Sequence, residues 1–219
     1  MRRDCVDDVR EHFRVLKEEE DFVVDKTGCK MLEILHASFV ADEETIFAPV
    51  NWDYVGREIA WYESQSLNVN DIPGGPPEIW KRVATKDGFI NSNYGWCVYS
   101  TTNGKQYESC KRELQDHPYS RRAVMYYGRP SMWYDYNRDG MSDFICTFAH
   151  QYFIRDGALH TSVTMRSNDV VFGYRNDRAW AKHVQDKLAA ELGVPSGQLY
   201  WQAGSLHVYE RHFDLISST

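Results

Sequence analysis

Hydrophobic residues recur at helical spacing in four stretches of the chain. Within residues 4–20 they stand at every third or fourth position, at Val6, Val9, Phe13 and Leu16. Residues 54–64 and 107–114 predict two more helices. After Gly173 the same period returns, and Gly193 and Pro195 stop it, with the apolar positions at Trp180, Val184, Leu188 and Leu192. This last pattern predicts a long amphipathic helix with a glycine at its carboxyl end.

Strand-like patterns mark two other regions. Residues 144–154 are rich in aromatic and β-branched side chains, and the run after them alternates apolar with polar positions, at Leu159, Thr161, Val163 and Met165. Asp156-Gly157 between the two runs predicts a tight hairpin turn. Residues 21–42 predict two further strands around a turn at residues 25–28. We expect loops at residues 71–77, followed directly by more strand, and at residues 129–143.

Composition narrows the class of protein. With 219 residues and 42% hydrophobic content, the chain is long enough for one sizeable core, so a single domain over residues 1–219 is expected. The 25 basic and 32 acidic residues give a net charge of −7. That balance disfavours a broad nucleic-acid-binding face, although local arginines can still bind a phosphate.

The cysteines and the apolar residues indicate whether a metal site, disulfides or a membrane segment should be expected. The five cysteines stand singly, without C-x-x-C or Cys/His ligand spacing, so neither a metal site nor a disulfide framework is expected. No long apolar run or signal sequence is present. We therefore expect no membrane partner and a cytoplasmic location.

The side chains able to do chemistry concentrate in residues 144–180. A thiolate at Cys146 would need a cationic neighbour that favours its ionised form, and Arg166 is the obvious one. Asn176 and Asp177 stand at the start of the expected long helix, where side chains can face a ligand. From these residues alone, a lone cysteine on an apolar strand is more often inert packing, and Asp177 as readily caps the helix.

The same residues resemble the thymidylate synthase superfamily. Its methyl-transferring members have an R-S-x-D stretch after the nucleophilic cysteine and an H-x-Y later, matched here by RSNDVVFGYRND at 166–177 and GSLHVYERH at 204–212. The chain is most similar to the phage deoxycytidylate (dCMP) 5-hydroxymethyltransferases of that superfamily. The matches run in order along nearly the whole chain, at residues 21–28, 90–96, 120–122, 129–132, 139–144, 165–173 and 204–209.

The resemblance implies a fold and an assembly. The fold is α+β, with a large mixed β-sheet flanked by helices, and two subunits pair sheet to sheet as a homodimer. Residues 1–219 would form one thymidylate synthase-like catalytic domain. Its carboxyl-terminal tail would be short or missing, which matters because in relatives the tail closes over the folate.

The resemblance also implies a reaction. A one-carbon unit passes from the co-substrate 5,10-methylenetetrahydrofolate to C5 of dCMP, and hydration gives 5-hydroxymethyl-dCMP, with no metal. Cys146 would add to C6 of the base, and Glu58 would order water and move protons. Asp177 replaces the asparagine that reads uracil in the methylating enzymes. A carboxyl group can accept from the N4 amino group of cytosine and share a proton with N3.

The resemblance assigns binding roles to further residues. Substrate binding falls to Lys26, Tyr94, Arg121, Arg122, Arg166, Ser167, Asn168, His207 and Tyr209. Arg121 and Arg122 would cross the dimer interface to the neighbour's phosphate, a task that suits forked guanidinium donors. Folate contacts fall to Trp80, Asp169 and Gly173. Without the resemblance, ordinary alternatives remain: a surface carboxylate at Glu58, a core aromatic at Trp80, a packed strand aromatic at Tyr94 and a solvated strand edge at the arginine pair.

Three other functions stay open. They are a CMP 5-hydroxymethylase of nucleoside biosynthesis, a dUMP-specific thymidylate synthase and a non-catalytic nucleotide-binding homologue. The second is disfavoured by Asp177 and by Ile145 and Thr147, which replace the Pro and His that usually flank the cysteine. The third is disfavoured by the complete set of Cys146, Glu58 and Asp177. For a phage-encoded enzyme, the cytoplasm would be that of the infected host cell.

Overall fold

The computed structural model describes residues 3–216, and the chain falls into two compact units. The boundaries lie between Val50 and Asn51 and between Phe153 and Ile154. Residues 51–153 are called the middle unit here. The segments on either side of it, up to residue 50 and from residue 154, together form the sheet unit.

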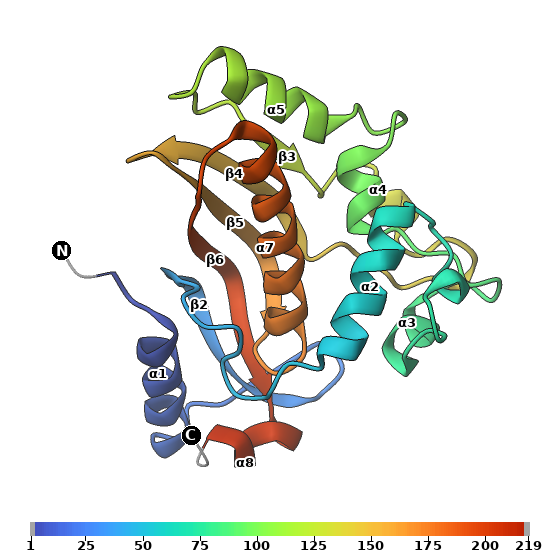
Figure 1. Ribbon diagram of the computed structural model, residues 1–219. Helices are drawn as coiled ribbons and strands as arrows, with labels where there is room; N and C mark the ends of the chain where they lie inside the picture. Colours follow the sequence, from blue (N-terminus) through green and yellow to red (C-terminus); the bar gives the residue numbers. More distant parts are fainter. Residues whose placement is uncertain (1–2, 217–219) are drawn as a thin grey trace. The chain divides into compact units, whose positions relative to one another are not determined.

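The sheet unit is built on four strands, of which Figure 1 labels β2, β5 and β6. They are β1 (Val23–Val24), β2 (Lys30–Val40), β5 (Ala158–Asp169) and β6 (Ser196–Tyr209), in the order β1-β2-β6-β5. Strands β1 and β2 are antiparallel, as are β2 and β6, whereas β6 and β5 run parallel. The prediction of a mixed sheet is therefore confirmed.

The alternating sequence pattern of β5 correctly predicted which side chains of that strand are buried. Its predicted inward positions are between 0% and 1% exposed, at Leu159, Thr161, Val163 and Met165. The turn just before β5 also forms as predicted, with positive φ at both Asp156 (51°) and Gly157 (76°). This combination is typical of the tight turns that join antiparallel strands.

Helices flank the strands of the sheet unit. These helices are α1 (Val6–Glu18), α7 (Gly173–Leu192), η3 (Glu210–His212) and α8 (Phe213–Ile216). Helix α7 lies along strands β5 and β6 (Figure 1). It ends at Gly193, where φ of 71° needs a residue without a Cβ, as the sequence predicted.

The middle unit is mainly helical. Its elements are α2 (Trp52–Ser64), η1 (Val69–Asp71), α3 (Glu78–Val83), α4 (Tyr94–Tyr99), α5 (Gln106–Asp116), β3 (Val124–Tyr126), α6 (Met132–Asp135), η2 (Arg138–Gly140) and most of β4 (Thr147–Arg155), whose last two residues lie past the boundary. Strands β3 and β4 pair antiparallel. The expected loop at 129–143 contains two short helices, α6 and η2.

The prediction of a strand after residue 77 was wrong, because helix α3 forms there. Pro77 takes the N-cap position in an extended conformation, which its fixed φ favours. Glu78 lies in the first turn, and Lys81 and Arg82 lie in the last. Acidic residues at the amino end and basic ones at the carboxyl end both stabilise a helix dipole, so the charges favour a helix over a strand.

Glycine sets the distance between two helices of the middle unit. Gly95 lies in α4 so close to α2 that a Cβ built on it would be 1.7 Å from the carbonyl oxygen of Tyr62. Only a residue without a side chain fits this approach.

Among residues 3–216, no helix is long and apolar enough to span a bilayer.

Candidate active site

Glu58 lies on the buried face of α2 and is 5% exposed. Its Oε1 accepts a hydrogen bond from the Tyr54 hydroxyl at 2.5 Å and from Trp80 Nε1 at 3.0 Å. Tyr54 stands one helical turn earlier, on the same face. Burial raises the pKa of Glu58, and the bonds from Tyr54 and Trp80 oppose that rise. The surface alternative for Glu58 is excluded, and its raised pKa suits a group that exchanges protons.

Cys146 is half-buried and directly precedes β4, which begins at Thr147. The prediction that it lies within a strand was therefore wrong by one residue. Thr147 Oγ1 donates a hydrogen bond to the Tyr94 hydroxyl at 3.0 Å, and both residues are buried. Tyr94 is the first residue of helix α4, so the strand alternative for it was also wrong. The structure brings Tyr94 against the immediate neighbour of Cys146.

Arg121 and Arg122 lie just before β3, with both side chains exposed. Arg122 Nε is 3.1 Å from Glu113 Oε1, yet its side chain remains 76% exposed. The backbone carbonyl of Arg121 accepts from Gln151 Nε2 at 2.8 Å. The segment that carries the two guanidinium groups is therefore fixed at its backbone, while the charged ends face solvent.

Asp177 lies in the second turn of α7, because the helix begins at Gly173 with Phe172 as its N-cap. The alternative that Asp177 caps this helix is excluded. Its Oδ2 accepts a hydrogen bond from Asn168 Nδ2 at 2.8 Å, and Asn168 Oδ1 accepts from Trp201 Nε1 at 3.1 Å. An indole nitrogen can only donate, so Trp201 fixes which end of the Asn168 amide faces the carboxyl group.

Gly173 leaves space for the side chains of Asn168 and Asp177. A Cβ at Gly173 would lie 3.1 Å from Asn168 Nδ2 and 3.6 Å from Asp177 Oδ2. A larger residue there would press on the donor of the Asn168–Asp177 hydrogen bond. The expected contact between Gly173 and folate stays a prediction.

Asp169 and His207 are partners across the parallel pair of β5 and β6. Asp169 Oδ1 accepts from the backbone N–H groups of Val171 (2.7 Å) and Phe172 (2.8 Å), which fixes the turn into α7. Burial lowers the pKa of His207, and the nearby charge of Asp169 opposes this effect. The His207 and Tyr209 rings are 5.1 Å apart on one face of β6.

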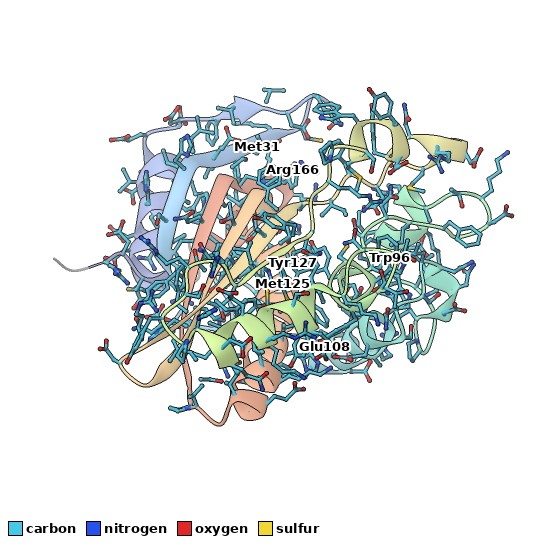
Figure 2. All side chains as sticks on the ribbon, turned by 90° about the horizontal axis from the view of Figure 1, so that it is seen from above. Met31, Trp96, Glu108, Met125, Tyr127 and Arg166 are labelled. Carbon is cyan, nitrogen blue, oxygen red and sulfur yellow. The ribbon has the colours of Figure 1, made fainter. Side chains whose placement is uncertain are left out.

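The predicted phosphate ligands of the sheet unit lie on β5 and in the turn before β2. Arg166, labelled in Figure 2, and Ser167 are half-buried near the carboxyl end of β5. Lys26 is exposed in the turn, which Asp25 holds by accepting from the N–H and hydroxyl of Thr27.

Within residues 3–216, no group of three or more His, Cys, Asp or Glu side chains is placed to hold a metal ion.

The sequence profile of the family described as thymidylate synthase matches residues 14–219, which is most of the chain. The chain belongs to the thymidylate synthase family. Its fold agrees with this assignment. The solved thermostable thymidylate synthase A of Bacillus subtilis superposes with a TM-score of 0.71, over 95% of this chain and 82% of that one, at 24% identity.

Members of the thymidylate synthase family differ widely in their similarity to this chain. Deoxycytidylate 5-hydroxymethyltransferase of Enterobacteria phage T4 is 54% identical over 218 residues, covering 96% of this chain and 89% of the phage protein. The enzyme of the same name from phage T6 is 55% identical over the same shares. Thymidylate synthase 1 of Bacillus subtilis strain 168 is 28% identical over 172 residues, covering 75% of this chain and 60% of that protein.

Several contacts of the candidate site were not predicted from the sequence. Tyr54 could have been found, because it stands four residues before Glu58 on an expected helix. Trp201 lies 33 residues from its partner Asn168, on β6, the strand that pairs in parallel with β5. The contacts of Asp143 with residues 91 and 92 likewise depend on loop paths that no periodicity describes.

Proposed function

We propose that this chain is a dCMP 5-hydroxymethyltransferase that takes its one-carbon unit from 5,10-methylenetetrahydrofolate. The observation that carries the proposal is 54% identity to the phage T4 enzyme of that activity over 96% of this chain. Cys146, Glu58 and Asp177 supply the three chemical functions that such a reaction needs. The enzyme would work in the cytoplasm of an infected host cell.

Cys146 is the nucleophile in this proposal. C5 of cytosine is a poor nucleophile until a thiolate adds to C6 and turns the ring into an enamine. The co-substrate supplies the methylene carbon to which C5 then bonds. The C5 proton is then lost and the bond between the methylene carbon and the folate nitrogen breaks, so that tetrahydrofolate leaves and an exocyclic methylene group remains on C5. Water adds to that methylene group, and the Cys146–C6 bond breaks to release 5-hydroxymethyl-dCMP.

Glu58 moves protons during these steps. Its carboxyl group is buried, its pKa is raised by burial, and its Oε1 is held by the Tyr54 hydroxyl and the Trp80 indole. A carboxyl group in such a setting can order the attacking water and take up its proton. The two donors keep the carboxyl group in one orientation.

Asp177 selects cytosine over uracil. Cytosine presents a donor at N4 and an acceptor at N3, and uracil presents the reverse pattern at O4 and N3. A carboxyl group can accept from N4 and share a proton with N3, whereas an amide matches uracil. Asn168 Nδ2 holds Asp177 Oδ2 at 2.8 Å, which fixes the plane that faces the base.

The remaining site residues bind the phosphate, the sugar and the folate. Arg166, Ser167 and Lys26 from one subunit, with Arg121 and Arg122 from its partner, would hold the phosphate, each charge-assisted bond contributing about 1.5–3 kcal/mol. His207 and Tyr209 would hold the sugar hydroxyl. Only Oδ1 of Asp169 receives the two backbone N–H groups, which leaves Oδ2 as an acceptor suited to the donors of a pterin ring.

Release of tritium from C5 of labelled dCMP tests the proposal. Release should require 5,10-methylenetetrahydrofolate, and it should be lost in Cys146→Ala. Mass spectrometry should find the product heavier than dCMP by one CH₂O group. If the wild type releases no tritium, or if Cys146→Ala releases it equally fast, the proposed function is wrong.

A further inference from the structure

Asp143, three residues before Cys146, has a buried carboxylate that accepts three hydrogen bonds. It is 7% exposed. Its Oδ2 accepts from the backbone N–H groups of Asn91 (2.7 Å) and Ser92 (2.8 Å), and its Oδ1 accepts from Ser92 Oγ at 2.6 Å. Its backbone carbonyl accepts from Asn91 Nδ2 at 3.2 Å. Four hydrogen bonds thus tie this residue to two consecutive residues of another segment.

A second tie lies on the other side of Cys146. Thr147, the next residue along the chain, donates from Oγ1 to the Tyr94 hydroxyl at 3.0 Å. Asn91, Ser92 and Tyr94 belong to one short stretch, residues 91–95. The segment that carries Cys146 is therefore fastened before and after the cysteine to the same stretch of chain.

Residues 91–95 are in turn fixed to α2, the helix that carries Glu58. Asn93 Nδ2 donates to the carbonyl of Trp61 at 3.0 Å and to that of Ser66 at 2.8 Å. Gly95 lies against the Tyr62 carbonyl with no room for a side chain. One continuous series of buried contacts therefore leads from α2 through residues 91–95 to the residues that flank Cys146.

We propose that Asp143 is a positioning residue, which holds Cys146 in register with Glu58 by clamping the cysteine segment to residues 91–95. This inference rests on the proposed function, because it needs Cys146 and Glu58 to act on one substrate. Asp143 itself touches no reacting atom. Its effect should appear in the rate of the chemical steps rather than in nucleotide affinity.

The carboxylate is the part of Asp143 that the clamp needs. Both of its oxygens accept hydrogen bonds. An asparagine of the same size would keep one oxygen on the two backbone N–H groups, but its NH₂ group would face Ser92 Oγ, and the remaining bonds would lose the charge of the carboxylate. The clamp would loosen without loss of core volume. A shift of the nucleophile by about 1 Å is enough to slow a reaction about a hundredfold.

Asp143→Asn tests the inference against Asp139→Asn. Asp139 is exposed in the same loop with φ of 52°, a conformation that asparagine tolerates, so this control makes the same change without touching the clamp. We expect kcat for tritium release to fall about ten- to a hundredfold in Asp143→Asn. The dissociation constant of dCMP, measured by equilibrium dialysis, should change less than about threefold. Asp139→Asn should match the wild type.

Ser92→Ala provides a milder second variant, because it removes one donor and leaves the two backbone N–H groups in place. Its kcat should fall less than that of Asp143→Asn, and the double variant should lose less than the product of the two single losses. Multiplicative losses, or a wild-type kcat in Asp143→Asn, would overturn the inference alone. Loss of dCMP affinity equal to the loss of kcat would also overturn it. An inactive wild type would instead overturn the proposed function, and this inference with it.

Discussion

At the scale of single residues, burial of Glu58, the proposed proton-transfer group, predicts a pH dependence of stability. Burial raises the pKa of its carboxyl group above 4.5 in the folded protein. Its contribution to stability is then fully present below the unfolded-state pKa and is lost as pH rises through the folded-state pKa. Glu58→Gln cannot ionise and should escape that loss. Urea unfolding from about pH 4 to pH 8 should show the variant gaining stability relative to the wild type, and parallel curves would contradict the prediction.

Asp177→Asn tests base selection. The substituted amide presents a donor where the carboxyl group accepts, so the ratio of kcat/KM for dCMP to that for dUMP should fall, by about a hundredfold. Asp186→Asn provides the control, because it makes the same change on the exposed face of the same helix. Competition between the two labelled nucleotides measures the ratio directly. An unchanged ratio would mean that another group reads the base.

Trp201 should influence the same ratio without touching substrate. Trp201→Phe keeps an aromatic ring in a site that is 0% exposed but removes the N–H group that holds Asn168 Oδ1. The Asn168 amide can then turn over and present its oxygen to Asp177, which would favour a protonated carboxyl group. We expect a smaller loss of dCMP preference than in Asp177→Asn, in the same kinetic competition. Wild-type selectivity in a folded variant would show that the amide is held by other contacts.

At the scale of elements, two glycines of the middle unit make a matched pair. Gly95→Ala places a Cβ 1.7 Å from the Tyr62 carbonyl, so α4 must move away from α2, which should cost about 1–3 kcal/mol of stability or more. Gly56→Ala, on the exposed side of α2, meets nothing within 4 Å and should gain about 0.5–1 kcal/mol. Thermal unfolding of both variants checks the pair. A Gly95→Ala variant as stable as the wild type would contradict the close packing of α4 on α2.

The elements also show what periodicity can and cannot predict. The buried faces of α1 and β5 were predicted residue by residue, because each repeats one period for several turns or positions. Helix α3 was missed because its six residues are too few for a period, and its charges and Pro77 decide its conformation. The strand boundary at Cys146 was misplaced for a similar reason. The segment around Cys146 is held by hydrogen bonds of Asp143 with Ser92 and of Thr147 with Tyr94, and these partners are distant in the sequence. Local alternation of apolar and polar residues therefore does not set the boundary.

At the scale of the whole molecule, the sequence identified the candidate site residues but not the contacts that hold them in place. The motif around Arg166 pointed to the correct family, and the T4 and T6 relatives extend that agreement over 96% of the chain. The supporting contacts, such as Asp143 with Ser92 and Trp201 with Asn168, join residues 51 and 33 positions apart. Such pairs follow from chain topology, which local sequence patterns do not encode.

The proposed homodimer makes a prediction that depends on two chains at once. If Arg121 and Arg122 serve the neighbour's phosphate, an Arg121→Ala/Arg122→Ala chain and a Cys146→Ala chain are each inactive alone, but they should complement each other after unfolding and refolding together. Half of the two-fold dimers would be hybrids with one intact site of two, so about a quarter of wild-type activity should return. If each chain used its own arginines, no hybrid would contain an intact site and no activity would return. The exposure of both side chains, 76% for Arg122, is what such a shared role requires.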